Sequence, residues 1–80
     1  MTTAARVLVI LEEIAETDEV RKDLDLELFH SDILDSLATV QLIVALEAEF
    51  GVEISPAEIE REDWATPRKI IAYLESRVGP

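Results

Sequence analysis

The sequence predicts an all-α fold, a four-helix bundle with a short third helix and a long first loop. Apolar residues recur at helical spacing in three segments, a capping residue precedes proline twice, and no cysteine is present for a disulfide or thiolate metal site. Eighty residues suffice for one small core, so we expect a single domain over residues 1–80. A chain of this size has little room for an enclosed active site.

The first helix is expected over residues 3–16. Apolar side chains recur there at the spacing of one helix face, at Ala4, Val7, Leu8, Leu11 and Ile14. Residues 17–35 lose this periodicity, yet they include several large apolar side chains, namely Leu24, Leu26, Leu28, Phe29, Ile33 and Leu34. We therefore predict that residues 17–35 form a long loop packed across the bundle.

The later helices have clear start and stop signals. Residues 36–50 are rich in Leu, Ala and Glu, and Gly51 follows them where a left-handed C-terminal cap is expected. Ser55-Pro56-Ala57-Glu58 has the order of a capping box, which predicts the start of the short third helix. Thr66-Pro67 repeats the cap-plus-proline signal and predicts a last helix that ends near Gly79.

The helix over residues 36–50 is apolar on two sides. One side is an ordinary core stripe of Leu42, Ile43, Leu46 and Phe50. A second apolar stripe on nearly the opposite side consists of Leu37, Val40, Val44 and Ala48, with Gln41 among them and Glu47 on their flank. Either this helix is buried in the middle of the bundle, or the second apolar stripe binds a partner. Because so few helices are available to cover it, we favour a docking face.

Ser36 lies where the long loop enters this helix. A serine at a helix start is often a cap. The same position also suits a phosphate ester, because free backbone N–H groups and the positive end of the helix dipole stabilise an anion there. Both interpretations of Ser36 remain open on the residues alone.

The surrounding residues resemble the acyl and peptidyl carrier protein family. The resemblance rests on Ile33-Leu34-Asp35-Ser36-Leu37 and continues through Thr39-Val40, Ala45-Leu46-Glu47 and Glu49-Phe50-Gly51. It implies the bundle of the acyl carrier protein type, with Ser36 receiving 4'-phosphopantetheine from coenzyme A inside a separate phosphopantetheinyl transferase. Asp35 accompanies it, either as a loop cap or as a transferase contact. The resemblance implies a non-catalytic carrier whose arm holds an acyl or aminoacyl thioester.

Within that family the chain is similar to the D-alanyl carrier proteins of teichoic acid modification. The similarity lies in Trp64-Ala65-Thr66-Pro67, in Glu27-Leu28-Phe29 and in the spacing of Ser36, Thr39 and Val40. It implies loading by an adenylating amino-acid ligase or an acyltransferase, and unloading at a membrane-bound acyltransferase. The alternatives are a carrier of a specialised-metabolite or fatty-acid-like pathway and, from another class, an unmodified helical adaptor.

The composition excludes several partners. Eighteen acidic and seven basic residues give a net charge of −11, which repels nucleic acid and favours partners with a basic face. The longest apolar runs, Val7 to Leu11 and Leu42 to Leu46, are far shorter than the ~20 residues that cross a bilayer, and the N-terminus lacks a secretory pattern. We therefore expect a cytoplasmic monomer that does not insert into membranes.

Other residues that could form a site are better explained structurally. His30-Ser31-Asp32 has the residue types of a catalytic triad, but consecutive side chains point apart. A single histidine and no cysteine disfavour a zinc site. Trp64 is expected to anchor the core between the last two helices. The sequence thus predicts no catalytic residue and no metal site.

The net charge leads to a prediction about stability. Raising the ionic strength from roughly 0.01 M to 0.15 M shortens the Debye length from about 30 Å to about 8 Å, which screens the self-repulsion of the folded chain. The melting temperature should therefore rise with moderate salt or divalent cations, as followed by circular dichroism. Equal melting temperatures at both ionic strengths would show that self-repulsion is unimportant here.

Overall fold

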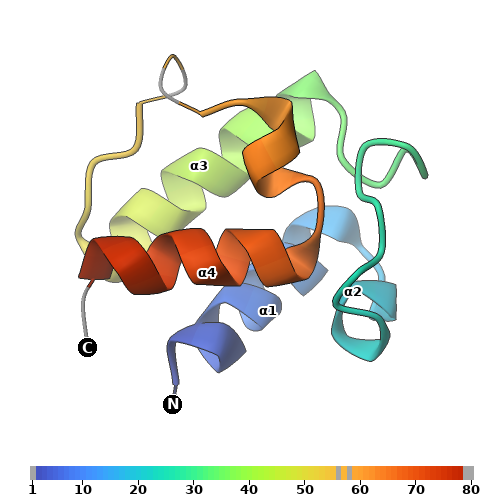
Figure 1. The fold of residues 1–80 in the computed structure, drawn as a ribbon, viewed down its shortest axis with the longest axis horizontal. Helices are drawn as coiled ribbons and strands as arrows, with labels where there is room; N and C mark the ends of the chain where they lie inside the picture. Colours follow the sequence, from blue (N-terminus) through green and yellow to red (C-terminus); the bar gives the residue numbers. More distant parts are fainter. Residues whose placement is uncertain (1, 56, 58, 79–80) are drawn as a thin grey trace.

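The computed structural model describes residues 2–55, 57 and 59–78. These residues contain no strand, which confirms the all-α prediction. The elements are α1 (Thr3–Ala15), α2 (Glu19–Lys22), α3 (Ser36–Phe50), the 3-10 helix η2 (Arg61–Trp64) and α4 (Pro67–Val78). Figure 1 shows α4 crossing in front of α1, with α3 above α4 and η2 (orange) above the start of α4. Of the described helices, none has the length and hydrophobicity to cross a bilayer.

The first helix, α1, packs against each of the other three described α-helices, α2, α3 and α4. Its Val7 and Leu11 side chains are fully buried. The Thr2 hydroxyl accepts a hydrogen bond from the Ala5 N–H at 3.1 Å and caps the start of the helix. The helix ends at Glu16, whose left-handed backbone conformation (φ 56°) turns the chain toward α2.

The core is built entirely from apolar side chains. No polar or charged side chain of the described residues is buried. Besides the three long helices, the loop between α1 and α3 contributes Val20, Leu28 and Leu34 to the core. The loop predicted over residues 17–35 is therefore packed across the bundle, but it also contains the single helical turn of α2, which the sequence did not predict.

Three contacts join this loop to the start of α4. The Leu28 N–H donates to the Ala65 carbonyl at 2.8 Å, and the Arg68 N–H donates to the Leu24 carbonyl at 2.9 Å. The Arg68 guanidinium donates to the Asp25 carboxylate at 2.9 Å. This hydrogen bond, together with the positive charge, holds the pKa of Asp25 below its ordinary value. The loop is thus fixed at its centre as well as at its ends.

A short 3-10 helix, η2 (Arg61–Trp64), precedes α4. The predicted start, Ser55 to Glu58, includes Pro56 and Glu58, which lie outside the described residues. In the described part the short helix is η2, where the Asp63 carboxylate accepts a hydrogen bond from the Glu60 N–H at 3.3 Å. Trp64 at its end is fully buried and meets Tyr73 of α4 edge-on, with ring centroids 5.7 Å apart. Its prediction as a core anchor is confirmed.

Phe50 lies at the margin of the core. The sequence placed it in the core stripe with Leu42 and Leu46, but it is only partly buried. The Arg6 guanidinium covers its ring at 4.4 Å and donates to the Glu49 carbonyl and carboxylate, each at 2.8 Å. Arg6 therefore ties α1 to the end of α3, where helical carbonyls lack partners within the helix.

Candidate functional site

Asp35 determines where α3 begins. Its backbone is extended, and its carboxylate accepts a hydrogen bond from the Ala38 N–H at 2.7 Å. Its carbonyl accepts hydrogen bonds from the Thr39 N–H at 3.0 Å and from the Thr39 hydroxyl at 2.7 Å. Asp35 is thus the N-cap, one of the two roles that the sequence left open for it.

Ser36, the first residue of α3, is exposed. Because Asp35 caps the helix, the serine is not needed for that purpose. Among the hydrogen bonds between described residues, none involves the Ser36 hydroxyl. The first turn of α3 contains no acidic residue, and the nearest carboxylate on the chain is that of the N-cap, Asp35. Ser36 therefore presents an accessible hydroxyl at the positive end of a 15-residue helix, a position that favours a phosphate ester.

The second apolar stripe of α3 faces solvent. Leu37 is 67% exposed, Val40 is 53% exposed and Val44 is 59% exposed, and Ala48 and Gln41 are exposed as well. The opposite side of the helix buries Leu42, Ile43 and Leu46. The interpretation of α3 as a helix buried on all sides is therefore wrong, whereas partner binding by the stripe stays a prediction.

Glu47 makes a contact that the sequence did not reveal. We expected its carboxylate at the rim of the second apolar stripe, but that carboxylate accepts a hydrogen bond from the Ile54 N–H at 2.9 Å. The Glu47 carbonyl accepts a second bond from Gly51, which has the left-handed conformation (φ 66°) expected of a C-terminal cap. Glu47 therefore binds the segment after α3 to the helix. Its carboxylate is engaged in this hydrogen bond and is less available to a partner.

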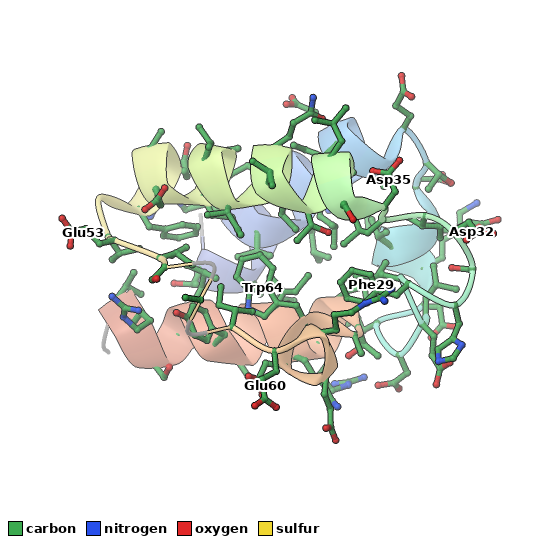
Figure 2. The ribbon with its side chains drawn as sticks, turned by 90° about the horizontal axis from the view of Figure 1, so that it is seen from above. Phe29, Asp32, Asp35, Glu53, Glu60 and Trp64 are labelled. Carbon is green, nitrogen blue, oxygen red and sulfur yellow. The ribbon has the colours of Figure 1, made fainter. Side chains whose placement is uncertain are left out.

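A groove of about 260 Å³ opens beside Ser36. Its α3 wall consists of Ser36, Thr39, Val40 and Ile43, and we call it the Ser36 groove. The opposite wall comes from the long loop and from the segment around η2, with Phe29, Ile59, Arg61 and Trp64. In Figure 2, Trp64 lies between α3 and α4, and Phe29 lies below Asp35 near the start of α3. The sequence did not reveal this groove, because the residues of its two walls are far apart along the chain.

The remaining candidates form no site. The Ser31 hydroxyl donates to the Glu27 carbonyl at 2.6 Å, and His30 Nε2 lies 3.8 Å from the Glu27 carboxylate at the surface. His30, Ser31 and Asp32 thus form no relay. Within the described ranges, no group of three or more histidine or acidic side chains is placed to hold a metal ion.

A small helical bundle that displays an unengaged serine at the start of a helix with an exposed apolar stripe is suited to be a carrier domain. A family model described as "Phosphopantetheine attachment site" matches residues 5–74, and the chain belongs to this family. Such carriers are not enzymes; they hold 4'-phosphopantetheine covalently and interact with a phosphopantetheinyl transferase and a loading ligase.

Curated relatives that the chain resembles include three D-alanyl carrier proteins. The protein of Lacticaseibacillus rhamnosus is 48% identical over 69 residues, which cover 86% of this chain and 85% of the relative. Those of Listeria innocua and Enterococcus faecalis are each 45% identical over 76 residues, which cover 95% of this chain and 97% of each relative. The likeness thus extends along almost the whole chain.

The two sides of α3 should respond differently to substitution. Val44→Glu should leave the melting temperature nearly unchanged, because the side chain is exposed, yet lower kcat/KM for the phosphopantetheinyl transferase by about tenfold, the effect of losing a central interface contact. Leu46→Ala, the control on the buried side, should cost ~2–5 kcal/mol of unfolding free energy in urea titrations. If Val44→Glu unfolds the protein as readily, the second apolar stripe is not a docking face.

Proposed function

We propose that this protein is a D-alanyl carrier, which holds D-alanine as a thioester on a 4'-phosphopantetheine arm attached to Ser36. The observation that supports this most directly is the Ser36 hydroxyl, exposed and unengaged at the start of α3. The names of relatives at 45–48% identity support the choice of D-alanine as the cargo. The sequence resemblance further indicates teichoic acid as the final acceptor.

The chemistry of attachment needs little from the carrier itself. Inside the transferase, the Ser36 oxygen attacks the phosphorus that bears pantetheine in the pyrophosphate of coenzyme A. A serine–phosphorus bond forms, the pyrophosphate bond breaks to release adenosine 3',5'-bisphosphate, and the hydroxyl proton passes to a base of the transferase. The α3 dipole favours the anionic diester. The attached arm supplies the thiol that this cysteine-free chain lacks.

Recognition of the loading enzyme falls to the surface of α3. Because the arm is flexible and alanine is small, the carrier makes few contacts that could distinguish its cargo. The adenylating ligase that docks therefore selects the amino acid. We assign that docking to the second apolar stripe and Gln41, with the acidic surface favouring a basic partner. We further propose that a monomer works in the cytoplasm, where coenzyme A and ATP are available, and delivers its cargo to a membrane-bound acyltransferase.

The attachment site is tested by mass spectrometry of the intact protein. After incubation with coenzyme A and a broad-specificity transferase, the wild-type chain should gain one pantetheine phosphate, and Ser36→Ala should gain none while remaining helical. Ser31→Ala is the matched control, because Ser31 donates to the Glu27 carbonyl and is not at a helix start. This variant should be modified like the wild type. A modified Ser36→Ala protein would overturn the assignment.

The cargo is tested by comparing two loading enzymes. The phosphopantetheinylated protein should be charged by a D-alanine-activating ligase with a kcat/KM at least about a hundredfold higher than that of a malonyl transferase, a docking difference of ~2.7 kcal/mol. Malonyl loading without D-alanine loading would refute the D-alanyl assignment and leave the carrier role intact. Loading only by a ligase for another amino acid would favour a specialised-metabolite pathway.

A further inference from the structure

Arg61 is the cation of the Ser36 groove. Among the described residues that line the groove, the charged ones are Asp35, Glu60 and Arg61. The Asp35 carboxylate is engaged with the Ala38 N–H. No carboxylate of the described residues lies within 4.0 Å of the Arg61 guanidinium. In a chain with a net charge of −11, this places a positive group in the same groove as the Ser36 hydroxyl.

The guanidinium of Arg61 is held in place by an aromatic ring. It lies 4.6 Å from the centroid of the Phe29 ring, within the range of a cation–π contact. The backbones that carry the two residues are joined, because the Leu28 N–H donates to the carbonyl of Ala65, the residue after η2. The Phe29 ring thus provides a fixed support for a side chain that would otherwise be free at the surface.

A phosphodiester on Ser36 would bring a negative charge into this groove. Guanidinium groups suit phosphate oxygens, because their planar N–H donors match two oxygens at once and their charge persists at every physiological pH. Stacking on an aromatic ring leaves the N–H edge of the guanidinium available. The carboxylates of Asp35 and Glu60 line the same groove and repel the phosphate, so a fixed cation there offsets that repulsion.

We propose that Arg61, supported by Phe29, binds the phosphate of the arm on Ser36 and orients the root of that arm. This inference rests on the proposed function. Arg61 acts as a positioning residue, since the cargo thiol is at the far end of the arm. Its effect is to restrict the directions in which the arm leaves α3.

A thermodynamic cycle separates this role from a merely structural one. Apo and phosphopantetheinylated forms of the wild type and of Arg61→Gln are prepared, and intact mass confirms each state before melting. Attachment should raise the melting temperature of the wild type by a few degrees more than that of Arg61→Gln, as expected for one added charge-assisted hydrogen bond in a domain of this size. A purely structural role would lower both forms of Arg61→Gln equally.

The phosphorus NMR resonance of the diester gives a second, direct measurement. It should shift in Arg61→Gln and stay in place in Arg21→Gln. Arg21 is the matched control, because it pairs with Glu12 at 3.0 Å and is not among the residues that line the groove. Arg61→Lys keeps the charge but lacks the planar guanidinium, so its phosphorus resonance should lie between those of the wild type and Arg61→Gln. This variant keeps the inference testable if Arg61→Gln folds poorly.

The outcomes distinguish this inference from the proposed function. A mass gain on Ser36 with equal melting shifts and unchanged phosphorus resonances in the Arg61 variants would overturn the role of Arg61 alone. Slower modification of Arg61→Gln without any change in the phosphorus resonance would also overturn it, because Arg61 would then serve the transferase. If no protein gains mass, the proposed function and this inference both fail.

Discussion

The hydrogen bond from the Ala38 N–H to the Asp35 carboxylate sets the geometry on which the site depends. It starts α3 at Ser36, two residues after the buried Leu34, and so determines which residues of the helix face the core. Successive residues are 100° apart, so a start displaced by one residue would turn Leu46 away from the core and bring Val44 closer to it. With the observed start, the Ser36 hydroxyl and the second apolar stripe both point outward, because the core takes the other side of α3.

The bundle leaves large apolar side chains exposed although its core is small. The core forms where α1 packs against both α3 and α4, and Trp64 fills the space beside α4. In the described part of the chain, this core contains no buried polar or charged residue. An enzyme of this size would have to open that core to enclose a substrate. A carrier needs only an accessible hydroxyl and a surface, because its reactive thiol arrives with the arm.

How well the sequence predicted each part depends on how local its cause is. The bounds of α3 were predicted correctly, since the signals at Asp35-Ser36 and at Gly51 adjoin the helix they delimit. The single turn of α2 was missed because four residues have no periodicity, and burial of Val20 against distant residues stabilises it. The hydrogen bond from the Ile54 N–H to the Glu47 carboxylate and the stacking of Arg61 on Phe29 were also missed, because each joins segments whose approach only the fold determines.

The proposed attachment site and the proposed docking surface are adjacent on α3, and Val40 belongs to both. Its side chain is part of the second apolar stripe and also lines the Ser36 groove. A partner that covers the stripe therefore also covers the rim of the groove, where we propose that the root of the arm lies. An enzyme that contacts the carrier surface is thus also next to the base of the arm that carries the cargo. In the function proposed above, this arrangement lets a small carrier control which enzyme reaches its thioester, because the enzyme binds α3 where the arm begins.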